Sequence, residues 1–203
     1  MTDKYIPLKI HKPDNLAVFL TFYSPLFIAL IVLSMSFIFQ NFKGIVYLMW
    51  IVLFSAIRSE WYQGFEDTSS NPICSMVQYS SKGNSTFSVF FIMFTMCYIC
   101  GPMFINNDIN YFIFSAFLFY LFLDIGIRYY SKCINYKSNI LLDFITGTGL
   151  GCGVVWLFYG ANIQKYLFFN ETSSNKEICS LPKKQTFKCS VYKNGELIGS
   201  SNR

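Results

Sequence analysis

The sequence predicts an all-α polytopic membrane protein, a fold class indicated by its composition and by its long uncharged runs. Of its 203 residues, 53% are hydrophobic and only 13% are charged, whereas a soluble globular domain carries about 25% charged residues. Most of its apolar runs approach the roughly 20 residues that a helix needs to cross a bilayer core of about 30 Å. The chain has too little polar surface for a water-soluble domain, so we expect about five transmembrane helices.

These helices are expected over five ranges, namely 17–39, 44–57, 86–105, 109–127 and 140–159. The first range is uncharged and no small-residue cleavage site follows it, which favours a retained span over a signal peptide. The second range is the shortest and ends at Arg58, whose long side chain can reach the membrane interface. Together the five spans define a helical bundle over residues 1–160.

Residues 161–203 are expected to form a polar, basic tail. Asn194 and Gly195 separate two alternating segments, a pattern that predicts a small β-hairpin over about 185–199. A disulfide between Cys179 and Cys189 would brace this hairpin if the tail faces an oxidising compartment, and free thiols are the alternative. Asn170 begins an Asn-Glu-Thr acceptor for N-glycosylation.

Two further motifs have structural explanations. The glycines between Gly147 and Gly153 lie inside a span, where small residues four apart let helices approach closely, and a dinucleotide loop would need a preceding strand. Cys97 and Cys100 also lie inside a span without partner ligands. Because His11 is the only histidine of the chain, we expect neither a metal site nor a cofactor.

Two aspartates, Asp124 and Asp143, lie at the edges of the last two spans. Intramembrane carboxylates are functional candidates, but pairing with a cation near the interface, Arg128 or Lys137, is the simpler account. Asp124 and Arg128 are four residues apart and share a helix face, so we expect this pair in particular.

The polar ends of the spans gather on one membrane face if the helices alternate in direction. The residues on that face are Arg58, Lys82, Gly83 and Arg128. Three cations beside a glycine turn and a helix N-terminus predict an anion site at the depth of lipid headgroups. The alternative is ordinary snorkelling of lysine and arginine side chains to the interface.

Residues 79–88, Tyr-Ser-Ser-Lys-Gly-Asn-Ser-Thr-Phe-Ser, resemble the F-P-S-G-H-S-x-F-S motif of the type 2 phosphatidic acid phosphatases, members of the lipid phosphatase and haloperoxidase superfamily. Arg128 and residues 135–139 resemble the S-R-x5-H-x3-D motif of that family with one residue inserted, and a glycine-rich last span follows. Arg58 falls near the first family motif, K-x6-R-P, without its spacing or its proline. The resemblance covers roughly residues 45–160 and implies a phosphatase-like helical bundle.

Three asparagines stand at the family's catalytic positions. Asn135 replaces the histidine that attacks phosphorus, Asn139 the aspartate that orients it, and Asn84 the histidine that protonates the leaving oxygen. An amide is neither a nucleophile nor a general acid near neutral pH. The resemblance therefore implies a pseudoenzyme in which Lys82, Gly83 and Arg128 retain the phosphate-binding part.

We therefore expect a catalytically inactive, lipid-phosphatase-like membrane scaffold that binds anionic lipid headgroups. A protein partner is expected on its basic face or tail, and no nucleic acid. The alternatives are an active lipid phosphatase with unusual catalytic residues, and a transporter or channel component lined by Asp124 and Asp143. The expected location is an endomembrane or the inner membrane of a virion. Loop charges predict a cytoplasmic anion site and a tail that lies outside the cell or in a lumen.

Overall fold

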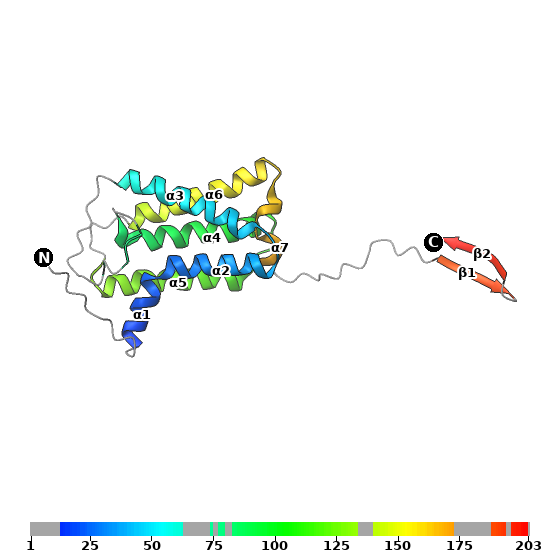
Figure 1. Cartoon of the computed structure of the whole chain (residues 1–203), viewed down its shortest axis with the longest axis horizontal. Helices are drawn as coiled ribbons and strands as arrows, with labels where there is room; N and C mark the ends of the chain where they lie inside the picture. Colours follow the sequence, from blue (N-terminus) through cyan, green and yellow to red (C-terminus); the bar gives the residue numbers. More distant parts are fainter. Residues whose placement is uncertain are drawn as a thin grey trace.

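The computed structural model describes residues 13–62, 74, 77–79, 83–133, 140–172, 188–193 and 196–202. Its main elements are α1 (Pro13–Phe22), α2 (Ser24–Ile38), α3 (Lys43–Trp61), α4 (Phe87–Ile105), α5 (Tyr111–Tyr130) and α6 (Ile140–Gly160). Three short helices complete the bundle, namely η3 (Asn84–Thr86), η4 (Gln164–Tyr166) and α7 (Phe169–Thr172). The axes of helices α2 to α6 are roughly aligned, with successive helices running in opposite chain directions, and α1 lies across them (Figure 1).

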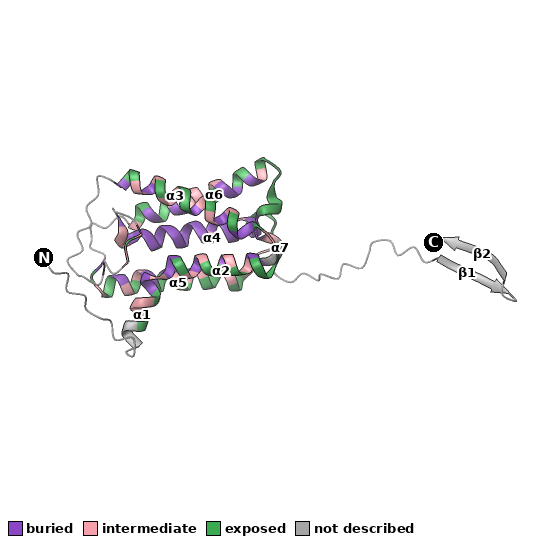
Figure 2. Cartoon of the chain, viewed as in Figure 1, coloured by how far each residue is buried: buried purple, intermediate pink, exposed green. Residues whose placement is uncertain are grey.

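Helix α4 is the core of this bundle. It packs against α2, α5, α6 and α7, and Figure 2 shows it buried along most of its length while its neighbours expose one face. The aromatic side chains in its middle, Phe90, Phe94 and Tyr98, are fully buried. A helix that is apolar on every side is stable only when surrounded, and this composition explains why α4 occupies the centre.

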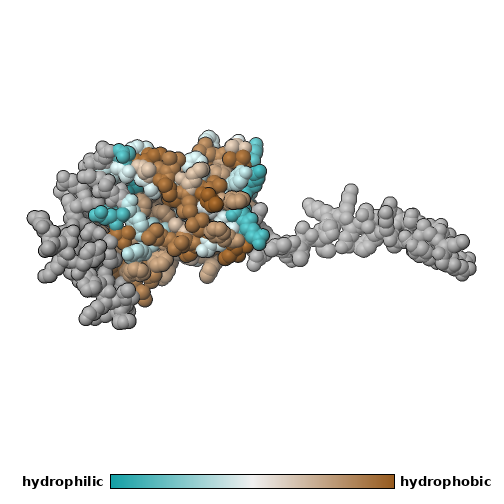
Figure 3. Space-filling model, in the orientation of Figure 1, coloured by the Kyte–Doolittle hydropathy of each residue, from teal (hydrophilic) through white to brown (hydrophobic). Residues whose placement is uncertain are grey.

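The outer surface of the bundle is suited to lipid. Large apolar side chains such as Phe112 and Trp156 are exposed, and Figure 3 shows a brown, hydrophobic band with more hydrophilic ends. By length and composition, α3, η3 with α4, α5 and α6 can each cross a membrane, and α1 with α2 makes a fifth candidate. All of these features are compatible with a helical, multi-pass membrane protein.

The first predicted span is corrected by the structure. Residues 17–39 do not form one straight helix, because α1 and α2 meet at an angle of 68°. Pro25 lies in the first turn of α2, where its missing N–H and its ring prevent the preceding helix from continuing through it. The second span is longer than the predicted range 44–57, since α3 continues to Trp61.

The glycines of α6 divide into two pairs with different surroundings. A Cβ atom added at Gly147 would lie 2.6 Å from the Phe90 carbonyl oxygen, and one at Gly151 would lie 2.7 Å from that of Phe94. Around Gly149 and Gly153 there is nothing within 4 Å. The predicted packing role is confirmed for the first pair, which brings the backbones of α4 and α6 together.

Strands β1 (Lys188–Lys193) and β2 (Glu196–Asn202) of the tail pair antiparallel, with Lys193 opposite Glu196. Two strands alone are marginally stable in water, so a stably folded hairpin stays a prediction. The predicted Cys179–Cys189 disulfide involves side chains outside those that the structure describes.

Candidate functional site

The candidate site lies at one end of the bundle, which we call the arginine end. Here α3 and α5 end, with Arg58 and Arg128 in their last turns. Helices α4 and α6 begin at the same end, with Gly83 just before η3 and Asp143 in the first turn of α6. The chain direction of four helices thus gathers these polar residues from distant parts of the sequence.

Arg58 and Asp143 form a buried ion pair that joins α3 to α6. The Arg58 side chain is 1% exposed; its Nε donates to Asp143 Oδ1 at 2.7 Å and its Nη2 to Oδ2 at 2.8 Å. The Tyr62 hydroxyl donates a third hydrogen bond to Oδ1 at 2.8 Å. Bidentate, charge-assisted contacts of this kind are among the strongest polar interactions in proteins. Asp143 therefore pairs with an arginine 85 residues away rather than with a cation of its own neighbourhood.

The same guanidinium also contacts the entry to α4. Arg58 Nη2 donates to the Gly83 carbonyl oxygen at 2.8 Å, and the Arg58 Cζ lies 4.3 Å from the centre of the Tyr62 ring. Among the described residues, no group accepts a hydrogen bond from the buried Nη1. Burial, together with the negative charge of Asp143, raises the pKa of Tyr62, so its hydroxyl stays a donor to that carboxylate.

Arg128 and Asp124 form a second buried cluster, within α5. Arg128 Nε lies 3.1 Å from Asp124 Oδ2, and the Ser88 hydroxyl donates to the same oxygen from α4. Arg128 Nη1 donates to the Ser85 carbonyl oxygen at 2.9 Å, and the guanidinium lies 4.6 Å from the centre of the Phe22 ring. The Asp124–Arg128 pair predicted from its four-residue spacing is confirmed.

Arg58, Gly83 and Arg128 thus come together around one turn, but as a different kind of site from the one expected. Both arginines are buried and paired with aspartates, whereas the predicted anion site counted them among three cations on one membrane face. The physical reason is that an uncompensated buried charge is very costly, and a nearby carboxylate offsets that cost. Lys82 lies outside the described residues.

Gly83 is required at this turn by its backbone conformation and by its neighbours. Its φ angle is +62°, in the left-handed region that favours glycine, and a Cβ atom there would lie 2.7 Å from the Tyr62 ring. The glycine lets the chain enter α4 directly beside Tyr62 and Arg58.

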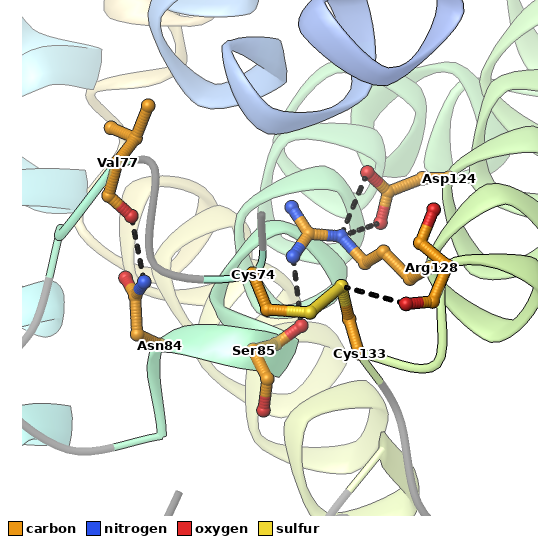
Figure 4. Close-up of a disulfide and its surroundings, with 8 residues drawn as sticks. Cys74, Val77, Asn84, Ser85, Asp124, Arg128 and Cys133 are labelled. Atoms are coloured by element: carbon orange, nitrogen blue, oxygen red, sulfur yellow. Dashed lines mark hydrogen bonds and ion pairs between the residues drawn. A yellow bond between two sulfur atoms is a disulfide. The ribbon is translucent and has the colours of Figure 1, made fainter. Parts of the chain in front are cut away.

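Asn84 has a structural use that its place in the phosphatase motif does not suggest. Its Nδ2 donates to the Val77 carbonyl oxygen at 2.7 Å, and its Oδ1 accepts from the Tyr79 N–H at 2.9 Å. The side chain thereby fastens residues 77–79 to the start of α4 (Figure 4). Burial raises the pKa of the neighbouring Tyr79 hydroxyl to about 12, and this hydroxyl donates to the Phe22 carbonyl oxygen at 2.9 Å. Asn135 and Asn139 lie outside the described residues.

A disulfide at the arginine end was not predicted. Cys74 and Cys133 are bonded, with their Cα atoms 5.4 Å apart, and the bond lies beside Arg128 (Figure 4). Both cysteines belong to a buried cluster with Phe22. The available signal was positional, because the two cysteines lie in polar segments on the same predicted membrane face. The described free cysteines, Cys97, Cys100 and Cys152, lie within α4 and α6.

The described part of the chain contains no group of three or more histidine, cysteine or acidic side chains suited to a metal ion.

The predicted acceptor at Asn170 ends in Thr172, whose hydroxyl is buried and donates to the Phe168 carbonyl oxygen. No protein-family model, curated protein or solved structure matches this chain, so the resemblance to the lipid phosphatases consists of the quoted motifs alone.

Proposed function

We propose that this chain is a non-catalytic, multi-pass membrane scaffold whose arginine end binds the phosphate of an anionic lipid headgroup. An endomembrane or virion inner membrane, and a protein partner on the tail or the arginine end, belong to the same proposal. Two sets of contacts support it, one bearing on catalysis and one on anion binding.

The polar groups of the arginine end serve packing, which argues against catalysis. Asp124 and Asp143 are each ion-paired, and the Asn84 amide bonds to the backbone at both of its ends. A general base or nucleophile needs a titrating side chain within reach of a substrate. The aspartates lie in two separate clusters at one end of the bundle, an arrangement that also argues against a conducting path between them.

The observation that carries anion binding is the buried Nη1 of Arg58, a charged donor with no acceptor among the described residues. An unmatched buried donor costs about 1–3 kcal/mol, more when charged. A phosphate oxygen is a suitable acceptor, since arginine binds phosphate through charge-assisted hydrogen bonds. Lys132 is exposed at the same end, close to where a headgroup would lie.

The binding test compares the thermal unfolding of the purified chain in phosphatidylcholine nanodiscs with and without phosphatidate. A ligand that binds the folded state raises the unfolding temperature, so we expect phosphatidate to raise it and additional phosphatidylcholine to leave it unchanged. A further sample with inorganic phosphate distinguishes a lipid headgroup from free phosphate as the ligand.

Arg58→Lys and Arg128→Lys form a matched pair for this test. Both keep a positive charge in a buried cluster, but only Arg58 has an unmatched donor. We expect Arg58→Lys to lose the phosphatidate response relative to its own baseline, and Arg128→Lys to retain it. Equal responses in both variants would contradict the assigned donor.

The catalytic test measures phosphate release from phosphatidate. We expect none from the wild type, and none from Asn84→His, because that change restores a single family position. Phosphate release by the wild type that disappears in Asn135→Ala would overturn the non-catalytic proposal in favour of an active lipid phosphatase.

A further inference from the structure

From the Cys74–Cys133 disulfide we infer that the arginine end faces an oxidising compartment, either an organelle lumen or the exterior, and that the C-terminal tail faces the reducing cytosol. This orientation is the reverse of the one that loop charges predict. It concerns the placement of the whole chain in its membrane and does not depend on headgroup binding.

The disulfide marks one membrane face unambiguously. Cys74 lies between the end of α3 and the start of α4, and Cys133 lies three residues after the end of α5. Both positions are at the arginine end, outside the helices that can cross the membrane. Each cysteine is 2% exposed and contacts Phe22, so the bond belongs to the packed interior of this end and not to a loose surface loop.

Disulfides persist in secretory, extracellular and periplasmic spaces, whereas glutathione and thioredoxin keep cytosolic thiols reduced. The described free thiols do not bear on this assignment, because they lie within α4 and α6 and so face neither compartment. Helix α6 begins at the arginine end, so Gly160 and α7, from which the tail continues, lie at the opposite end of the bundle (Figure 1). If the arginine end is oxidising, the tail is cytosolic.

Charge opposes this orientation less strongly once the paired arginines are recognised. The prediction counted Arg58 and Arg128 as loop cations, but both are buried in ion pairs. Without these two arginines, six lysines lie near the membrane on the arginine side and three on the other side. The six are Lys4, Lys9, Lys12, Lys82, Lys132 and Lys137, and the three are Lys43, Lys165 and Lys176. The positive-inside rule, which counts cations close to the ends of the spans, then favours a cytosolic arginine end by three charges instead of five. Disulfides are rare in the reducing cytosol, so we let the disulfide decide.

This orientation changes what is expected of the tail. A cytosolic tail keeps Cys179 and Cys189 reduced and leaves Asn170 unglycosylated. The predicted tail disulfide and glycan are thus outcomes that distinguish the two orientations.

Glycosylation acceptors created by single substitutions test the orientation in a eukaryotic host, in an Asn170→Gln background. Lys184→Asn places an acceptor before Gln185 and Thr186 in the tail, and Glu66→Asn places one before Asp67 and Thr68 in the segment that contains Cys74. We expect an endoglycosidase-sensitive mass increase for Glu66→Asn and none for Lys184→Asn. A glycan on Lys184→Asn would overturn the inference.

Antibody access to a C-terminal epitope tag tests the same orientation without depending on how efficiently an engineered acceptor is glycosylated. When only the plasma membrane is permeabilised, the antibody is expected to reach the tag, as it reaches a cytosolic control protein. A tag that is stained only after all membranes are opened would overturn the inference.

Thiol counting tests the bond itself. The cells are quenched with acid, and the protein is denatured so that every free thiol, including the buried Cys97 and Cys100, is alkylated before reduction. The disulfide is then reduced, and the newly released thiols are labelled with a maleimide polymer. We expect two labels on the wild type and none on the Cys74→Ser, Cys133→Ser double variant. Four labels would show an oxidised tail, and no labels would show reduced cysteines at the arginine end; either result contradicts the inferred orientation.

Discussion

Arg58 joins three helices through a single side chain. Its guanidinium contacts Asp143 of α6, the Gly83 carbonyl oxygen before α4, and the ring of Tyr62 just after α3. A lysine cannot reproduce these contacts, because the planar guanidinium binds both carboxylate oxygens at once. At the residue scale, the arrangement of the bundle thus depends on a few buried polar side chains in addition to apolar packing.

The Arg58–Asp143 pair can be tested by a double-mutant cycle. Asp143→Asn removes the partner charge of a buried guanidinium, and breaking such a pair costs about 3–5 kcal/mol. We expect Arg58→Met and Asp143→Asn each to lower the free energy of unfolding, and the double variant to lose less than the sum of the two. Denaturant titration in detergent measures all four forms. Lys132→Ala, at an exposed site, is the control, and additive losses would contradict the coupling.

Asn84 allows a second test at the same scale. Asn84→Ala removes the acceptor for the Tyr79 N–H and the donor to the Val77 carbonyl oxygen, and each unmatched group costs about 1–3 kcal/mol if it stays buried. We expect a lower unfolding temperature and faster proteolysis of the segment between α3 and α4. Asn84→Asp keeps only the acceptor, so we expect its unfolding temperature to lie between those of the wild type and Asn84→Ala. Wild-type behaviour of Asn84→Ala would refute the fastening role.

Local spacing and long-range contacts differ in how far they can be predicted. The Asp124–Arg128 pair follows from a four-residue spacing on one helix, which the sequence displays directly. The Arg58–Asp143 pair spans 85 residues, and it depends on the end of α3 meeting the start of α6 in the folded bundle. A hydropathy pattern identifies the helices but not which of their ends meet, so the partner of Asp143 could not be predicted.

At the scale of helices, α4 and α6 meet through one glycine pair and leave the other open. Gly151→Ala places a Cβ atom 2.7 Å from the Phe94 carbonyl oxygen and 2.8 Å from the Cys97 Cβ, so the helices must separate. Overpacking of this kind costs about 1–3 kcal/mol. We expect a clearly lower unfolding temperature for Gly151→Ala.

Gly149→Ala is the matched control for this helix contact. It makes the same chemical change two residues away, where nothing lies within 4 Å, and alanine is the better helix former by about 1 kcal/mol. We expect unchanged or slightly raised stability in the same thermal assay. Equal losses for both variants would show that the effect comes from the α6 backbone and not from its contact with α4.

Hydropathy alone does not predict the bend between α1 and α2. The run over residues 17–39 is continuously apolar, so a hydropathy pattern extends through it without interruption. Pro25 was the visible signal, but a proline can kink a membrane helix or begin a new one. Beyond the bend of 68°, α1 packs against α5, a contact that residue spacing does not contain.

For the whole molecule, the described buried ion pairs and the described disulfide all lie at one end. The disulfide joins residues separated by 59 positions. In the chain-entropy model, a cross-link of this span lowers the entropy of the unfolded chain and so stabilises the folded state by about 4 kcal/mol. We expect Cys74→Ser to lower the unfolding temperature, and a dithiol reductant to lower that of the wild type to a similar value. Cys152→Ser removes an exposed free thiol and is expected to have little effect. Unchanged stability of Cys74→Ser would show that the bond adds nothing to the folded state.

The bend at Tyr23 has a consequence for the surrounding lipid. Helix α2 has 15 residues, and at about 1.5 Å per residue it is only about 22 Å long, shorter than a bilayer core of about 30 Å. Such hydrophobic mismatch is relieved by thinning the bilayer beside the short segment or by drawing flanking side chains toward the interface. The flank of the bundle formed by α2 therefore favours a thinner membrane than the flanks formed by α3, α5 and α6, and the protein should partition into thin bilayers in preference to thick, sterol-rich ones.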